Sequence, residues 1–232
     1  MADPKSRDGG VYHDPKILAL VEEIYGGHPP GLAEALAALE QYDLPRIQIS
    51  ASDGRILRLL LRAIGARRVV EFGTLSGYSA LWILDALGPE GRLLTCEMDP
   101  RHARAAARVF DAAGVAERVE IVPGNAREHF DLLASRGPFD AAFIDADKTG
   151  YAAYARWAFD HLRPGGLVIA DNAYLFGHLA PPPPGLDDSH AAERRAVLEL
   201  HRLFAQRTSA CLPTPDGLAV ALVEPATRGE PR

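Results

Sequence analysis

Charged and amide side chains follow two apolar runs of the sequence, where they could act together on a ligand. Asp145, Asp147 and Lys148 come directly after the run AAFI in the stretch AAFIDADKTGY. Asp171 and Asn172 follow the next such run, GGLVIA. If both runs are neighbouring strands, their ends lie about 5 Å apart. We therefore expect Asp145, Asp171 and Asn172 to surround one point beyond the carboxyl ends of the strands, where open parallel sheets bind ligands.

The chemistry of these side chains favours a hard metal ion. Two carboxylates and an amide oxygen suit Mg²⁺, with Mn²⁺ or Ca²⁺ as alternatives, better than Zn²⁺, since no histidine or cysteine joins them. A divalent cation lowers the pKa of a hydroxyl bound to it. Lys148, whose ammonium form a nearby cation would disfavour, could then take the hydroxyl proton. The alternative is that Lys148 is a surface lysine paired with Asp147.

The elements that would position these residues follow from the alternation of short apolar runs with helical patterns, which predicts βαβ units and a parallel sheet. The expected strands are RRVVEFG, RLLTCEM, RVEIVPG, FDAAFIDA and GGLVIADN. The expected helices between them are GYSALWILDALG, DPRHARAAARVFDAAG, AREHFDLLASR and YAAYARWAFDHL. A further helix at about 189–207 and two strand-like pieces ending in LAVALVEP follow, after a loop at 173–188 that contains the Pro181–Pro184 run.

A chain of 232 residues with 47% hydrophobic residues is long enough to bury one substantial core. We expect a single domain over 1–232, consisting of an N-terminal helical extension (1–50), a Rossmann-like core (51–225) and a tail (226–232). Three amphipathic segments upstream of the sheet, 14–25, 31–42 and 53–65, are expected to be helices that cover one end of the sheet or form a subunit contact.

The turn after the first strand reads EFGTLSG and fits neither the dinucleotide pattern G-x-G-x-x-G nor the phosphate loop. Gly73 and Gly77 would let the backbone pass close to a ligand. Ser76 or Ser79 could cap the next helix or offer a hydroxyl to a carboxylate. The alternative is that the glycines only make a tight turn.

Two features after the following strands point to a nucleoside without phosphates. Glu97 ends the second strand, where an acid can accept both hydroxyls of a ribose. The turn Gly124-Asn125-Ala126 after the third strand leaves space for a flat adenine. A ribose and an adenine without a phosphate site suggest S-adenosylmethionine, although Glu97 alone could be a solvated strand end.

The segments EFGTLSGYS, CEMDP, FDAAFIDADKTGY and GGLVIADN, in this order, resemble the cation-dependent O-methyltransferases that include the caffeoyl-CoA and catechol O-methyltransferases. The resemblance covers roughly 45–225. It implies an α/β, Rossmann-like class I methyltransferase with a mostly parallel seven-stranded sheet. The final strand of that sheet is reversed, and LAVALVEP could supply it. The implied metal ligands are Asp145, Asp171 and Asn172, and the implied catalytic residues are Lys148 and Asp145. The implied S-adenosylmethionine contacts are Glu71, Gly73, Ser79, Glu97, Ala126, Asp145 and Tyr154.

The acceptor side departs from the plant members of that family. They read D-N-T-L-W where this chain reads DNAYLFG, so we expect a small catechol-like molecule or natural-product intermediate rather than caffeoyl-CoA. Tyr174, Phe176 and His178 are candidates for lining the acceptor pocket. Two alternatives stay open: a tRNA hydroxyuridine methyltransferase of the same fold, and a non-catalytic nucleotide-binding Rossmann-like module. The net charge of −6 counts against a nucleic-acid partner.

The remaining expectations concern location and assembly. The two cysteines, Cys96 and Cys211, give no disulfide framework, which fits a cytoplasmic protein. The chain shows no apolar signal core at its N-terminus and no apolar run near the ~20 residues that span a bilayer, so no membrane partner is expected. The N-terminal helices and the family resemblance suggest a homodimer.

Overall fold

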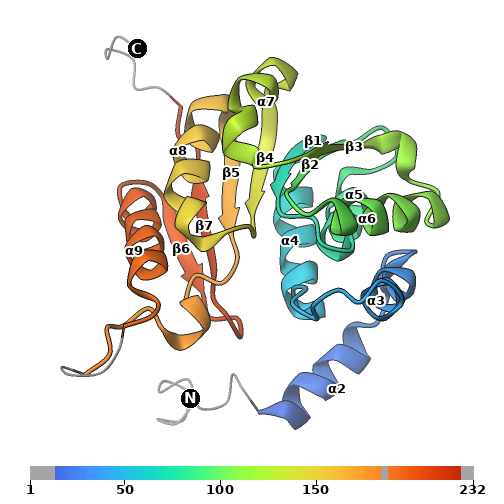
Figure 1. The fold of residues 1–232 in the computed structure, drawn as a ribbon, viewed down its shortest axis with the longest axis horizontal. Coiled ribbons are helices and arrows are strands. Elements are labelled where there is room, and N and C mark those ends of the chain that lie inside the picture. The colour runs from blue at the N-terminus through green and yellow to red at the C-terminus, as the bar shows by residue number, and fades with distance from the viewer. Residues whose placement is uncertain (1–13, 184–187, 226–232) are drawn as a thin grey trace.

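A seven-stranded sheet forms the centre of the molecule in the computed structural model, which describes residues 14–183 and 188–225 (Figure 1). The strands lie in the order β3-β2-β1-β4-β5-β7-β6. Their bounds are β1 Arg68–Phe72, β2 Arg92–Glu97, β3 Val119–Pro123, β4 Phe139–Ile144, β5 Leu162–Ala170, β6 Ser209–Leu212 and β7 Leu218–Leu222. The first five pair in parallel, and β7 runs antiparallel to both β5 and β6. The mostly parallel sheet and its reversed strand are therefore confirmed.

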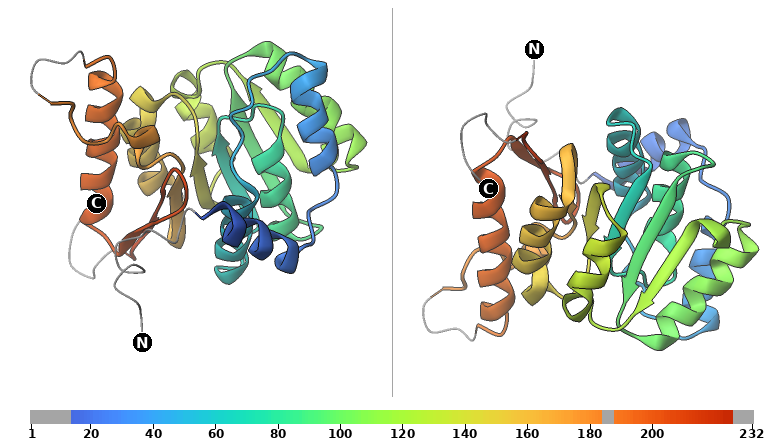
Figure 2. Two further views of the ribbon diagram at one scale, coloured as in Figure 1. Left: turned by 90° about the horizontal axis from the view of Figure 1, so that it is seen from below. Right: turned by 90° about the horizontal axis from the view of Figure 1, so that it is seen from above.

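Helices cover both faces of the sheet (Figure 2). Their bounds are α2 Pro15–Tyr25, α3 Leu32–Gln41, α4 Ala51–Ala63, α5 Tyr78–Leu87, α6 Pro100–Ala112, α7 Phe130–Arg136, α8 Tyr151–His161 and α9 Ala191–Ala205. Short 3₁₀ turns occupy Ala116–Arg118 (η1), Ala126–His129 (η2), Lys148–Gly150 (η3) and Leu175–Gly177 (η4).

Two of the expected elements differ in detail. The single helix expected over 126–136 is a 3₁₀ turn, η2, followed by α7; Asn125 caps the turn by accepting a hydrogen bond from the amide of Arg127. The loop expected over 173–188 contains η4. Pro184 of the proline run, together with the expected tail at 226–232, lies outside the described residues.

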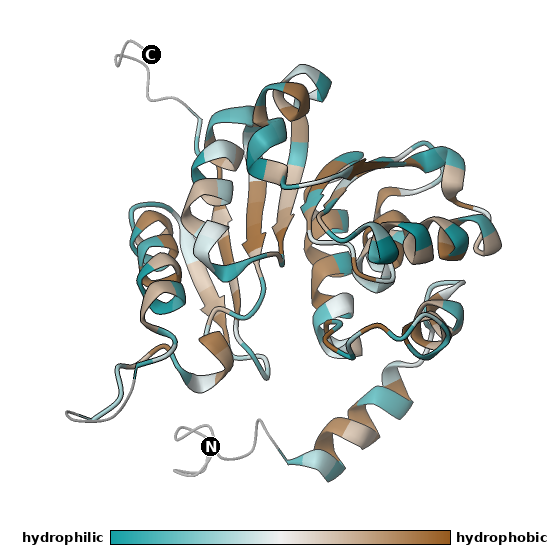
Figure 3. Cartoon of the chain, in the orientation of Figure 1, coloured by the Kyte–Doolittle hydropathy of each residue, from teal (hydrophilic) through white to brown (hydrophobic). Residues whose placement is uncertain are grey.

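The alternation of side chains along the strands divides the apolar core on the sheet into two clusters, and a third, smaller cluster joins Leu39 and Leu44 to Ala105 of α6. On β1, Val70 and Phe72 belong to the cluster shared with α7, α8 and α9. Val69 belongs to the cluster shared with α3, α4, α5 and α6. Apolar residues accordingly predominate in the strands at the centre of the sheet (Figure 3). Because both clusters use the same sheet, we propose that the chain forms one domain.

The N-terminal helices cover one side of the sheet, with α3 packing on α5 and α6, and α4 packing on α5. Helix α4 begins at an N-cap, Ser50, whose hydroxyl accepts from the amide of Asp53 at 3.1 Å. Gly54 lets α4 approach α5 closely, since a Cβ at this position would lie 2.4 Å from the Trp82 ring. In contrast, α2 has no buried residue. No helix in the described part of the chain is long and apolar enough to cross a membrane.

Candidate active site

A cavity of about 880 Å³ lies beyond the carboxyl ends of the strands. Its walls come from the segments that follow β1 to β5 and from the segment between α3 and α4. The sequence-predicted residues that line it are Gly73, Ser79, Glu97, Ala126, Asp145, Lys148, Tyr154, Asp171 and Asn172. Glu71, also predicted to contact the cofactor, is fully buried and lies behind this wall.

The loop after β1 passes directly over the end of β4. Gly73 has a φ of +97°, and a Cβ at this position would lie 2.1 Å from the backbone oxygen of Asp145. The amide of Gly73 donates to the oxygen of Cys96 at 2.9 Å, and the amide of Asp145 donates to that of Phe72 at 2.9 Å. Gly73 therefore brings the loop after β1 into contact with the strand end that holds Asp145, an approach that a residue with a side chain could not make without strain.

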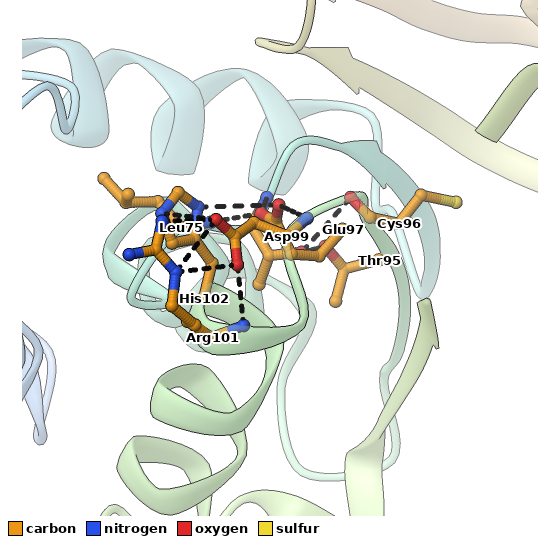
Figure 4. Close-up of polar contacts among 8 residues, drawn as sticks. Leu75, Thr95, Cys96, Glu97, Asp99, Arg101 and His102 are labelled. Atoms are coloured by element: carbon orange, nitrogen blue, oxygen red, sulfur yellow. Dashed lines mark hydrogen bonds and ion pairs between the residues drawn. The ribbon is translucent and has the colours of Figure 1, made fainter. Parts of the chain in front are cut away.

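Glu97 is held by three backbone amides (Figure 4). Its Oε2 accepts from the amides of Thr74 at 3.1 Å and Leu75 at 2.8 Å, and its Oε1 accepts from the amide of Asp99 at 2.8 Å. The imidazole Nδ1 of His102 lies 3.5 Å from the same Oε1. The carboxylate is thus a fixed part of the cavity wall, with its position set by the glycine loop and the start of α6.

Glu71 forms hydrogen bonds only with hydroxyls among the described residues. Ser79 Oγ donates to its Oε1 and Thr95 Oγ1 donates to its Oε2, each at 2.6 Å. The second of the two roles considered for Ser79, a hydroxyl offered to a carboxylate, is therefore confirmed. The pKa of Glu71 is raised from 4.5 to about 8, mainly by burial; the two hydrogen bonds oppose this rise, and the nearby charges of Asp145 and Glu97 add to it.

Lys148 points to Asp145 and not to Asp147. Its Nζ donates to Asp145 Oδ1 at 3.0 Å and to the Tyr151 hydroxyl at 2.6 Å. Asp147 accepts instead from the hydroxyls of Thr149 and Tyr154. The alternative of a Lys148–Asp147 surface pair is wrong, because these two hydroxyls take the Asp147 carboxylate while Lys148 is drawn into the cavity wall.

Asp171 and Asn172 lie beside each other at the end of β5, as predicted. Asp171 is 3% exposed, and its Oδ1 has no hydrogen-bond partner. Burial, and then the negative charge of Asp145, raise the pKa of Asp171 well above its usual range. Asn172 Nδ2 lies 3.3 Å from Asp171 Oδ2 and 3.3 Å from Asp216 Oδ2.

A cation fits this donor set. Among the described residues, no group of three or more His, Cys, Asp or Glu side chains is placed to hold a metal ion. A metal here would therefore rest on two carboxylates, Asp145 and Asp171, and on the amide oxygen of Asn172. A buried carboxylate oxygen without a partner carries a large desolvation cost that a cation would offset. The unpartnered Oδ1 of Asp171 is the observation that makes the three residues suitable for a hard cation.

Besides Glu193, which is paired with His190, the sequence reasoning missed two carboxylates that line the same cavity, Asp53 and Asp216. Asp53 is 4% exposed; its Oδ2 accepts from Ser50 Oγ at 2.6 Å, while its Oδ1 has no partner. Asp216 lies in the turn between β6 and β7. Both occur in sequence contexts typical of structural roles, a helix N-terminus and a Pro-Asp-Gly turn, so only their place in the fold distinguishes them.

One of the three candidates for the acceptor wall borders the cavity. Phe176 lies there with its ring centroid 5.7 Å from Lys148 Nζ, and it is 54% exposed. Tyr174 instead packs over Gly217, and the His178 ring stacks on that of His190 at 4.2 Å. The part of the loop nearest to Lys148 is therefore aromatic, and the other two rings stabilise the loop itself.

Comparison with known proteins agrees with this arrangement. The sequence profile of the O-methyltransferase family matches residues 24–223. The catechol O-methyltransferase of Mycobacterium tuberculosis is 40% identical over 214 residues, which cover 90% of this chain and 96% of that protein. The structure of the O-methyltransferase TomG from Streptomyces achromogenes, involved in tomaymycin synthesis and solved with S-adenosylmethionine, is 34% identical with a TM-score of 0.80, covering 90% of this chain and 96% of that one.

A third relative has the same fold. The O-methyltransferase from Bacillus cereus, solved with S-adenosylhomocysteine, is 30% identical with a TM-score of 0.79 and covers 89% of this chain and 96% of that one. The fold and the cavity define a Rossmann-like methyltransferase. The chain belongs to the O-methyltransferase family and is a methyltransferase dependent on S-adenosylmethionine, of the catechol and caffeoyl-CoA type.

Proposed function

We propose that the protein transfers a methyl group from S-adenosylmethionine to a hydroxyl of a small catechol-like or natural-product acceptor, with the help of a divalent cation, Mg²⁺ or alternatively Mn²⁺ or Ca²⁺. One observation carries the proposal. Lys148, the carboxylates of Asp145 and Asp171 and the amide of Asn172 share one cavity with the glycine loop, so a hydroxyl and a methyl donor could meet there.

The donor would occupy the half of the cavity formed by the segments after β1, β2 and β3. Gly73 gives close backbone approach, the fixed carboxylate of Glu97 offers its remaining lone pairs to ribose hydroxyls, and buried Ala126 leaves a flat space for the adenine. This order along the sheet would direct the sulfonium end toward Asp145, at the end of β4. Holding the methyl carbon close to the nucleophile supplies most of the rate gain in such transfers.

The acceptor would occupy the half formed by the segments after β4 and β5. Asp145, Asp171 and Asn172 would hold the cation, which supplies the chemistry of acidifying a hydroxyl bound beside it. Lys148 Nζ is held by Asp145 and Tyr151 at the edge of this half. As the new C–O bond forms and the C–S bond breaks, the acceptor's proton would leave to Nζ of Lys148, acting as the base, and then to water, with S-adenosylhomocysteine released.

The test is methyl transfer from labelled S-adenosylmethionine to a panel of catechols, hydroxycinnamates, caffeoyl-CoA and bulk tRNA, each with Mg²⁺ and with a chelator. We expect transfer to a vicinal diol, its loss with chelator and its recovery with added Mg²⁺. Asp171→Ala should behave like the chelator, whereas Glu120→Gln, an exposed acid on β3, should not differ from the wild type. Methyl transfer that is unchanged by the chelator would contradict the proposed metal dependence. Transfer to tRNA alone would contradict the proposed small-molecule acceptor.

We also propose that the protein is a homodimer through α2. This helix exposes Ile17, Leu20, Ile24 and Tyr25 at 46%, 56%, 69% and 70%, and Arg55 of α4 fixes its end by donating to the oxygen of Gly26 at 2.9 Å. A contiguous apolar face of this kind marks an association surface. Sedimentation at micromolar concentration should give twice the mass of one chain, and a Leu20→Glu, Ile24→Glu variant should give that of one. A wild type that sediments as one chain would contradict the dimer.

A further inference from the structure

The side chain of Asn172 lies between two carboxylates, one on each side. Its Nδ2 is 3.3 Å from Asp171 Oδ2 and 3.3 Å from Asp216 Oδ2. Both contacts are made by the amide nitrogen, which can donate to a carboxyl oxygen, whereas an amide oxygen in its place could not donate to either neighbour. The two neighbours therefore determine which way round the Asn172 amide sits, with Oδ1 turned away from both.

Asp216 reaches this position because the β6–β7 turn is bound to the segment after β5. The amide of Tyr174 donates to the oxygen of Asp216, and the amide of Ala173 donates to the oxygen of Gly217, both at 2.9 Å. Gly217 has a φ of +74° and lies under the Tyr174 ring, where a Cβ would be only 2.8 Å from the ring. The β6–β7 turn thus holds the carboxylate of Asp216 against the side chain of Asn172, which follows β5.

We propose that Asp216 is a positioning residue that orients the Asn172 amide so that its oxygen is available to a cation. The inference rests on the proposed metal dependence but concerns a residue that is not itself a ligand. An amide turned the other way would present N–H groups to the cation. Such residues hydrogen-bond to the atom of a metal-binding side chain that does not face the metal. Their removal weakens metal binding by about 10- to 100-fold.

Two substitutions separate orientation from charge. Asp216→Ser keeps a residue suited to the turn but its hydroxyl is too short to reach Asn172, so the acceptor is lost. Asp216→Asn removes the charge but can still offer its amide oxygen to Asn172 Nδ2. The matched control is Glu193→Gln, another acid that lines the cavity but is paired with His190 at 2.7 Å.

The measurement is the Kd of Mn²⁺ for the protein without substrate, by titration calorimetry and by the electron paramagnetic resonance of free Mn²⁺. We expect Asp216→Ser to weaken Mn²⁺ binding about 10- to 100-fold, Asp216→Asn to weaken it clearly less, and Glu193→Gln to leave it unchanged. The affinity for S-adenosylmethionine and the urea midpoint, measured alongside, should change little, which separates this role from a structural one.

A double-mutant cycle completes the test. In an Asn172→Asp background both side-chain oxygens can bind the cation and no amide remains to be oriented, so Asp216→Ser should no longer weaken Mn²⁺ binding. Equal losses for the Ser and Asn variants, or an undiminished loss in the Asn172→Asp background, would overturn the orientation role. A wild type that binds S-adenosylmethionine but no Mn²⁺ would overturn the metal dependence and this inference with it, whereas unchanged Mn²⁺ binding in Asp216→Ser would overturn only the inference.

Discussion

The buried carboxyl of Glu71 should make the stability of the protein depend on pH in a way that one substitution removes. Its pKa is about 8 in the folded protein and 4.5 in the unfolded chain, mainly because burial disfavours the charged form. Between these two values the folded state binds the proton and the unfolded state does not. The free energy of unfolding therefore falls as the pH rises from about 4.5 to about 8, and this contribution is constant above that range.

The size of the effect follows from the separation of the two pKa values, about 3.5 units. At about 1.36 kcal/mol per unit, ionisation of Glu71 costs the folded state up to about 5 kcal/mol, of which about 3 kcal/mol is lost between pH 5.5 and pH 8. Glu71→Gln mimics the protonated side chain, since its amide can accept from one of the two hydroxyls at 2.6 Å and donate to the other. Between pH 5.5 and pH 8, we expect the free energy of unfolding of the variant to rise by about 3 kcal/mol relative to that of the wild type.

The assay is urea unfolding without cofactor at half-unit steps from pH 5.5 to pH 8.5. The two proteins share every titratable group except Glu71, so the difference between the two curves isolates this residue. The exposed acid Glu120, changed to Gln, is the control and should follow the wild type. Parallel curves for Glu71→Gln and the wild type would refute the reasoning, since they would mean that Glu71 is ionised throughout and that its two hydroxyls satisfy the charge.

Three further predictions concern the cavity wall. Gly73→Ala should unfold the protein or cost more than about 3 kcal/mol in urea melts, because its Cβ would meet the backbone at 2.1 Å, whereas Gly65→Ala, with a φ of +61° and open space, should cost about 1 kcal/mol. Lys148→Met should lower kcat about 10²- to 10⁴-fold with little change in the Kd of S-adenosylmethionine, and a loss confined to KM would contradict a proton-transfer role. Glu97→Gln should weaken S-adenosylmethionine about 10- to 100-fold by calorimetry, because an amide cannot accept from three backbone N–H groups at once; unchanged affinity would exclude Glu97 from the donor site.

Most of the sheet could be predicted from the sequence because its physical signals are local. Apolar runs of strand length, separated by helical patterns, determine where a parallel strand ends, and the residues just after those ends form the cavity wall. Asp145 and Asp171 could be brought together on this basis alone. The split of the expected helix at 126–136 into a 3₁₀ turn and α7 could not be predicted, because over a single turn an i, i+3 spacing of apolar residues is compatible with both kinds of helix.

The residues that sequence reasoning missed depend on contacts between distant segments. Asp216 is 44 residues from Asn172, and its Pro-Asp-Gly setting is fully explained by a tight turn. Only the antiparallel placement of β7 beside β5 brings that turn to the end of the central strands. The reversed strand can then be understood as more than an edge of the sheet. It supplies a carboxylate that β5 could not place opposite its own Asn172, so the same hairpin completes the sheet and fixes the orientation of a predicted ligand.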